Sequence, residues 1–171
     1  LNKIKNQELL IKAFAKIHNN FKEWKIYIYG DGELRNYLKK LIISLNLAEK
    51  VFLKGVSKKI YNQFASCTIY AHSSNHEGYP NAVIEALVSG KCVISTNSLG
   101  VNAILKNRKV GLVSDCGDIK KFSENLRLLM SNDILREKYE YNTKKFTKIF
   151  CIRKIGYLWI DLFYEVIGLK K

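Results

Sequence analysis

The sequence holds few residues that could stabilise a fold through covalent bonds or metals. No two cysteines form a CxxC pair, and their wide spacing predicts buried free thiols in a reducing compartment rather than a disulfide framework. The four are Cys67, Cys92, Cys116 and Cys151. His72 and His76 lie four residues apart, without a His-Glu-x-x-His pattern or cysteines at ligand spacing. We therefore expect no metal site, no metal cofactor, and polar loop or surface positions for both histidines.

Long apolar runs are also missing. No stretch approaches the roughly 18 apolar residues of a membrane-spanning helix, and the first residues lack the layout of a signal peptide. With 171 residues, of which 47% are hydrophobic, the chain is expected to form one domain with its own core in the cytoplasm. Because the sequence begins at Leu1 and its single methionine is Met130, we expect it to be a fragment of a longer protein.

Acidic residues are scarce relative to basic ones, at 15 against 29, which leaves a net charge of +14. Such an excess favours a negatively charged partner, although a solvated, lysine-rich surface explains it equally well. The lysines are scattered, with no arginine-rich helix and no basic run between stacking aromatics. We therefore expect a diphosphate-bearing ligand and attraction to an anionic membrane face, and no nucleic acid.

Pro80 is the only proline, and it lies in a stretch, residues 73–96, around which the chain is organised. A fixed φ and a missing N–H suit the first turn of a helix. Apolar residues recur at helical spacing after Pro80, and Gly90 follows the last of them as a suitable C-cap. The stretch therefore predicts a strand over residues 68–71, a loop, a helix from Pro80 or Asn81, and a strand from residue 92.

Two carboxylates, Glu77 and Glu85, belong to this unit. In parallel α/β sheets, ligands bind where the carboxyl ends of strands run into helix N-termini. The loop with Glu77 occupies that position, and Glu85 lies one turn into the helix, from which it can point toward the same crevice. Because an ionised carboxylate accepts hydrogen bonds from neighbouring hydroxyls, the pair suits recognition of a polyhydroxyl ligand.

The residues Glu77-Gly78-Tyr79-Pro80-Asn81, followed by Glu85-Ala86, Gly90 and Val93, resemble the paired-glutamate signature of retaining nucleotide-sugar glycosyltransferases of family four, which have the two-domain GT-B architecture. The similarity continues elsewhere. Lys5-Asn6 resembles the family's phosphate-binding lysine and first helix, residues 28–32 its glycine loop, and residues 51–55 its strand near the base.

We expect an α/β fold with a Rossmann-like, doubly wound parallel sheet, the C-terminal half of a GT-B enzyme. Strands are predicted at 24–29, 51–53, 68–71, 92–95 and 110–113, and helices at 7–18, 33–45, 58–65, 118–130, 133–146 and 152–168. In the family, a central strand precedes the first of these helices; it is missing here, so a gap is expected in the sheet.

Residues 1–150 are expected to form the donor-binding domain. The helix within 151–171 is expected to pack on the absent N-terminal domain, with a membrane surface as the alternative.

The resemblance implies transfer of a sugar, with retention of configuration, from a nucleoside-diphosphate sugar, expected to be a UDP-sugar. Lys5 would offset diphosphate charge, Glu77 would orient the donor sugar and face the developing oxocarbenium, and Glu85 would hold the ribose. Backbone groups of residues 78–82, namely Gly78, Tyr79, Pro80, Asn81 and Ala82, would contact the sugar or phosphate. Gly30 would line the cleft, and Gly55 and Val56 would face the base. No cofactor is implied, because the nucleotide-sugar is a substrate.

Two departures from the family pattern are visible. His72 stands where the family usually has a proline. The loop after Thr96 keeps a single glycine, Gly100, and has Ala103 near a glutamate position, which leaves phosphate contact by this loop open. A non-catalytic nucleotide-sugar-binding subunit and a GT-B nucleotide-sugar epimerase therefore remain alternatives. The acceptor, a glycan or a lipid-linked molecule, would be held by the missing N-terminal domain, with the protein in the cytoplasm or at the inner face of the plasma membrane.

Overall fold

The structure is a computed structural model that describes residues 1–105 and 109–168. Its strands are β1 (Ile26–Tyr29), β2 (Val51–Gly55), β3 (Ile69–His72), β4 (Cys92–Thr96) and β5 (Gly111–Ser114). Its α-helices are α1 (Gln7–Ala15), α2 (Arg35–Ser44), α3 (Ile60–Ser66), α4 (Asn81–Val88), α5 (Leu99–Leu105), α6 (Ile119–Ser131), α7 (Asp133–Phe146) and α8 (Ile152–Val166). Two short 3-10 turns, His18–Asn20 and Thr147–Phe150, follow α1 and α7.

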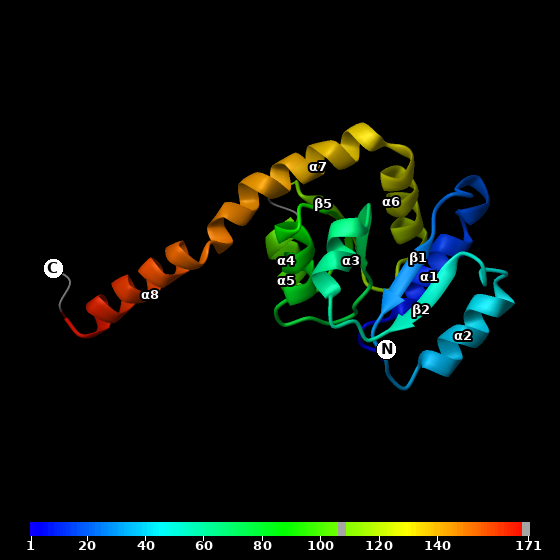
Figure 1. Ribbon diagram of the computed structural model, residues 1–171, viewed down its shortest axis with the longest axis horizontal. Helices are drawn as coiled ribbons and strands as arrows, with labels where there is room; N and C mark the ends of the chain where they lie inside the picture. The colour runs from blue at the N-terminus through cyan, green and yellow to red at the C-terminus, as the bar shows by residue number, and fades with distance from the viewer. Residues whose placement is uncertain (106–108, 169–171) are drawn as a thin grey trace.

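Strands and helices alternate, and every strand pair is parallel, so the predicted Rossmann-like α/β fold is confirmed (Figure 1). The strands divide between a two-stranded sheet, in the order β1-β2, and a three-stranded sheet, in the order β3-β4-β5. The interruption agrees with the gap that was expected for a chain without the family's central strand.

Strand β4 is the most deeply buried part of the three-stranded sheet, with all five residues inaccessible. Cys92 and Ile94 belong to one hydrophobic cluster with α1 and α6, whereas Val93 belongs to a second cluster with α3, α4 and α5. Since successive side chains of a strand point to opposite faces, both faces of the sheet are covered by helices. That burial explains why β4 begins with three consecutive apolar residues, Cys92, Val93 and Ile94, rather than with an alternating pattern.

The first five residues form a loop, as predicted, and this loop joins the two sheets. The carbonyl of Leu1 accepts a hydrogen bond from the Leu34 N–H at 3.2 Å, and that of Ile4 accepts one from the Asn75 N–H at 2.8 Å. Leu34 lies after β1 and Asn75 after β3. The loop therefore ties the carboxyl ends of both sheets together, beside the elements that were expected to bind the donor.

Two predictions about the elements and the cysteines were wrong. The segment after Thr96 is not a loop throughout, because Leu99–Leu105 forms α5 and buries Val101, Ile104 and Leu105. Not all cysteines are buried: Cys92 is buried and Cys67 half-buried, but Cys116 and Cys151 are exposed. Both exposed thiols lie outside the strands.

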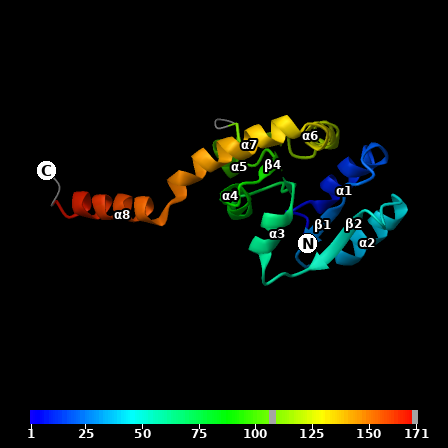
Figure 2. The same cartoon turned by 45° about the horizontal axis from the view of Figure 1, so that its top comes forward.

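Helix α8 extends away from the body of the molecule, beyond the end of α7 (Figures 1 and 2). None of its residues is buried, although it carries large apolar side chains such as Leu158, Trp159 and Phe163. Within residues 1–105 and 109–168, no helix is both long and apolar enough to cross a bilayer.

Candidate functional site

The site is assembled where the loop after β3 meets the N-terminal segment. The Ser73 hydroxyl donates to the Lys5 carbonyl at 2.9 Å, and the Ser74 hydroxyl donates to the Ile4 carbonyl at 3.1 Å. Asn6 caps α1 by accepting from the Leu9 N–H. These contacts hold Lys5 at the start of α1, directly beside the loop that carries Glu77.

Lys5 and Glu77 form an ion pair, with 2.7 Å between Nζ and Oε1, although 72 residues separate them in sequence. The Lys5 side chain is 48% exposed and that of Glu77 only 11%. Partial burial disfavours the charged form of Glu77, but hydrogen bonds from Lys5 and Ser74 outweigh it and lower the pKa of the carboxyl. The two residues predicted to be catalytic are thus brought together, and Glu77 is ionised at neutral pH.

His72 is the residue that the sequence placed wrongly. It is the buried last residue of β3, not a surface residue, whereas His76 is exposed in the loop as expected. Its Nε2 lies 3.2 Å from Oε1 of Glu77, and its Nδ1 lies 3.4 Å from the Tyr70 hydroxyl. Burial lowers the pKa of His72 against the opposing pull of the Glu77 charge, so the imidazole is neutral at neutral pH. The apolar strand continues through Ala71, and this pattern was the signal in the sequence that could have predicted the burial of His72.

Glu85 lies in α4 and is partly exposed. Burial raises the pKa of Tyr70 well above its usual value, and the charges of Glu77 and Glu85 raise it further. Both carboxylates therefore influence the same phenol. That the pair faces a common crevice stays a prediction.

The backbone of residues 78–82 turns into α4 as the proline predicted. Pro80 is the N-cap residue and is buried, whereas Gly78 and Tyr79 are exposed, and Asn81 and Ala82 begin the helix. The Val83 and Ile84 N–H groups donate to the Pro80 carbonyl at 3.0 and 3.1 Å. The exposed turn and the helix N-terminus therefore stand beside Glu77.

Gly100 holds this turn in place from the other side. A Cβ atom at Gly100 would lie 2.7 Å from Cδ of Pro80 and 2.8 Å from the Gly78 carbonyl oxygen, too close for any other residue. The one glycine left in the segment after β4 therefore serves the approach of α5 to the turn. Ala103 lies exposed in the same helix.

Gly30 and Gly55 meet at the carboxyl ends of β1 and β2. The Gly30 N–H donates to the Gly55 carbonyl at 2.7 Å, and Gly30 has a φ of 116° that side-chain-bearing residues rarely adopt. Val56, the next residue, is 79% exposed. Gly30, predicted to line the cleft, thus lies together with Gly55 and Val56, predicted to face the base, at one edge of the small sheet.

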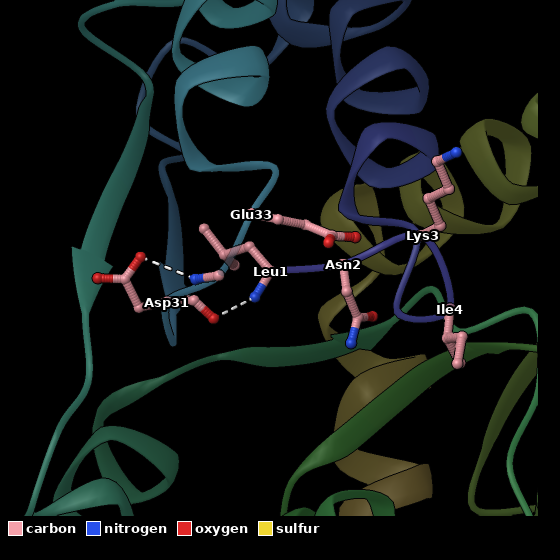
Figure 3. Close-up of a pocket in the computed structure, with 7 residues that line it drawn as sticks. Leu1, Asn2, Lys3, Ile4, Asp31 and Glu33 are labelled. Atoms are coloured by element: carbon pink, nitrogen blue, oxygen red, sulfur yellow. Dashed lines mark hydrogen bonds between the residues drawn. The ribbon is translucent and has the colours of Figure 1, made fainter.

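A hollow of about 420 Å³ lies between this edge and the N-terminal segment. Figure 3 shows its wall, in which the Leu1 backbone nitrogen donates to the Asp31 carbonyl and the Gly32 N–H is bonded to the Asp31 carboxylate. The lining residues are Leu1, Asn2, Lys3, Ile4, Asp31, Gly32 and Glu33. The glycine loop after β1 borders this hollow through Asp31 and Gly32, whereas Gly30 is not among the lining residues. The place of Gly30 in the donor cleft stays a prediction.

No group of three His, Cys, Asp or Glu side chains in the described part of the chain is placed to hold a metal ion. The expected absence of a metal cofactor stays a prediction. Positive charge at the site comes from Lys5 and from the N-terminus of α4.

Comparison with known proteins identifies the family to which the chain belongs. The family of glycosyl transferases group 1 matches residues 1–146. The chain is 32% identical over 157 residues to N-acetylgalactosamine-N,N'-diacetylbacillosaminyl-diphospho-undecaprenol 4-alpha-N-acetylgalactosaminyltransferase of Campylobacter jejuni. That match covers 91% of this chain and 42% of the relative, so the chain spans less than half of the relative's length.

Two solved structures share the fold. Anabaena HepE in complex with UDP superimposes with a TM-score of 0.87 at 20% identity, over 96% of this chain and 46% of that one. The C-terminal domain of the group 1 glycosyl transferase LpcC from Francisella tularensis superimposes with a TM-score of 0.76 at 20% identity, over 86% of this chain and 80% of that domain. Since the family match covers most of the sequence, the chain belongs to the group 1 glycosyl transferases.

Proposed function

We propose that this chain is the donor-binding half of a retaining glycosyltransferase that uses a nucleoside-diphosphate sugar, most simply a UDP-sugar. The observation that carries the proposal is the ion pair between Lys5 and Glu77 at the carboxyl end of β3, beside the turn into α4. A cation and a partly buried, ionised carboxylate in contact suit the two ends of a sugar diphosphate.

Lys5 would bind the diphosphate and stabilise the negative charge that develops as the nucleotide leaves. Its ammonium group is half-exposed and pairs with Glu77, so it can turn toward an incoming anion. The N-terminus of α4 adds partial positive charge, so this chain's own groups can carry the diphosphate without a metal.

Glu77 would accept hydrogen bonds from hydroxyls of the transferred sugar and face the developing oxocarbenium. Its lowered pKa keeps it ionised for this role. Glu85 would accept hydrogen bonds from the ribose hydroxyls, and Gly55 and Val56 would border the base. With retention, the acceptor would attack from the front face, without an obligatory covalent intermediate on the protein.

The relatives support this assignment. HepE was crystallised with UDP, and the relative from Campylobacter jejuni is named for adding N-acetylgalactosamine to a diphospho-undecaprenol-linked saccharide. We therefore propose a hexose or N-acetylhexosamine as the transferred sugar and a glycan or lipid-linked molecule as the acceptor. An N-terminal half, in contact with α8, would hold that acceptor.

A lipid-linked acceptor places the reaction at a membrane surface. The net charge of +14 would attract the protein to anionic lipids, so we propose a cytoplasmic protein that associates with the inner face of the plasma membrane. The exposed lysines would supply that attraction without any inserted segment.

Calorimetric titration with UDP and then with UDP-sugars tests the donor site. In the full-length protein, Lys5→Ala and Glu85→Ala should each weaken UDP binding about 10- to 100-fold, as expected for the loss of a charged hydrogen bond. Lys16→Ala, which removes an exposed lysine at the end of α1, is the matched control and should leave affinity unchanged. If neither Lys5→Ala nor Glu85→Ala changed the affinity for UDP, the donor would not bind at these residues.

The altered segment after β4 favours one alternative, a subunit that binds nucleotide-sugar without turning it over. Gly100 is occupied in packing against Gly78 and Pro80, and Ala103 provides no carboxylate. Donor binding without transfer or hydrolysis by the full-length protein would favour this alternative. Interconversion of UDP-sugars instead of transfer would point to an epimerase.

A further inference from the structure

Glu77 has a second neighbour besides Lys5, and this neighbour is buried. The Lys5 ammonium and the His72 Nε2 both approach the same carboxylate oxygen, Oε1, at 2.7 and 3.2 Å. The His72 side chain is 8% exposed and that of Lys5 48%. Nε2 makes no well-aligned hydrogen bond, so it is a buried polar atom with the Glu77 carboxylate within reach. Buried polar atoms in proteins are almost always hydrogen-bonded, so Nε2 is expected to have a partner in the working protein.

The ionised Glu77 carboxylate determines which nitrogen of His72 carries the proton. A neutral imidazole has one donor and one acceptor nitrogen, and an ionised carboxylate only accepts. Nε2 faces Oε1 of Glu77 at 3.2 Å, so the N–H lies on Nε2. Nδ1 is then the acceptor, and the Tyr70 hydroxyl, 3.4 Å away, donates to it.

Lys5 and His72 differ in what happens to them when a donor binds. Under the proposed function, on which this inference rests, Lys5 turns to the diphosphate and leaves Oε1. His72 is enclosed and anchored by Tyr70, so it stays. It is then the contact that keeps the carboxylate from rotating away from the sugar.

We propose that His72 is a positioning residue, which holds Oε1 of Glu77 through Nε2–H while Lys5 is engaged with the diphosphate. The residue acts through Glu77 and does not reach the substrate itself, since Nε2 is inaccessible. It stands where the resemblance to the family led us to expect a proline, which offers no side-chain donor.

Charged and titratable groups surround His72 on several elements. They are Tyr70 on β3, Glu77 in the loop, Lys5 in the N-terminal segment and Glu85 on α4, which acts on Tyr70. The Glu77 charge raises the pKa of His72 and the Lys5 charge lowers it. Protonation of Nδ1 would remove the acceptor for Tyr70 and loosen the arrangement, so activity should decline as His72 becomes charged at acidic pH.

The kinetic test uses the full-length protein with its UDP-sugar. His72→Phe removes the donor and should lower kcat about 10- to 100-fold with little change in UDP affinity, as expected for a misplaced catalytic group. His72→Gln keeps an N–H near the position of Nε2 and should recover most of the rate, with the acidic decline removed. His18→Gln is the control, and thermal unfolding verifies that each variant is folded.

A second measurement does not depend on turnover. Nitrogen-15 NMR of the imidazole should show the Nε2–H tautomer, with the pKa of His72 lowered further by Glu77→Gln and raised by Lys5→Met. A His72 pKa that changes with neither substitution, or a His72→Phe variant that retains the full rate, would overturn the proposal. A wild-type protein that neither binds UDP nor turns over any UDP-sugar would instead overturn the proposed function.

Discussion

The loop after β3, residues 73–80, and helix α8 differ in how far the rest of the chain contacts their side chains. Three segments converge on the loop: the N-terminal residues, the end of β3 and the start of α5. In α8 no residue is buried, and the large apolar side chains of Trp159 and Phe163 are exposed. The loop has its partners within this chain, whereas α8 presents an exposed apolar surface, which is typical of an interaction site.

Binding sites need side chains held in one geometry, and the loop obtains this from contacts that span 68 to 72 residues of sequence, such as that between Lys5 and Glu77. An exposed amphipathic helix such as α8 depends only on its own pattern of side chains.

The largest effect is expected at Glu77. Glu77→Gln in the full-length protein keeps the side-chain size but removes the charge, and should lower kcat about 100- to 1,000-fold while UDP affinity changes little. Steady-state kinetics and calorimetry measure the two quantities. Glu124→Gln, an exposed helix position, is the control. A variant with near-normal kcat would contradict the role of Glu77.

A smaller effect, on stability rather than on catalysis, is expected at Gly100. Gly100→Ala places a methyl group against Pro80 and Gly78, so it should destabilise the chain by about 1–3 kcal/mol through overpacking. Urea unfolding measures the change. Gly156→Ala in α8 meets no atom within 4 Å and should leave stability the same or slightly higher. Equal stability of both variants would mean that the turn at Gly78 and Pro80 shifts to accommodate the added methyl group.

Stability should depend on pH through His72. The pKa of His72 is lowered in the folded state from an ordinary value of 6.5, so the unfolded chain binds more protons below pH 6.5. Stability should therefore fall as the pH drops below about 6.5 toward the folded-state pKa, by at most about 1.4 kcal/mol per pH unit from one group. Urea unfolding between pH 5 and 7 measures the slope, which His72→Gln should reduce. An identical slope in the variant would assign the effect to other groups.

The smallest effect on this chain is expected in α8. Replacing Trp159 and Phe163 by serine should change the stability of the chain itself by less than about 0.5 kcal/mol, because both side chains are exposed. Under our proposal that the helix packs on the acceptor-binding half, the same change should lower the melting temperature of the full-length protein. Unchanged melting together with lost binding to anionic vesicles would instead assign α8 to the membrane surface.

Much of the fold follows from local patterns. The apolar runs predicted the positions of all five strands within a few residues, and Pro80 predicted the start of α4. Helix α5 was missed because Asn97, Ser98 and Gly100 are typical of loops, while its helical state depends on burying Val101, Ile104 and Leu105 against the sheet. Here tertiary packing overrode local propensity.

The sequence by itself determined the elements, the paired glutamates and the family, because short-range spacing and backbone preferences act within a few residues. The tertiary structure alone decided that Lys5 and Glu77 form an ion pair, that His72 is buried against Glu77, and that Gly100 packs on Pro80. These contacts join segments far apart in the chain. Their geometry depends on how helices and strands pack around β4, which no local pattern encodes.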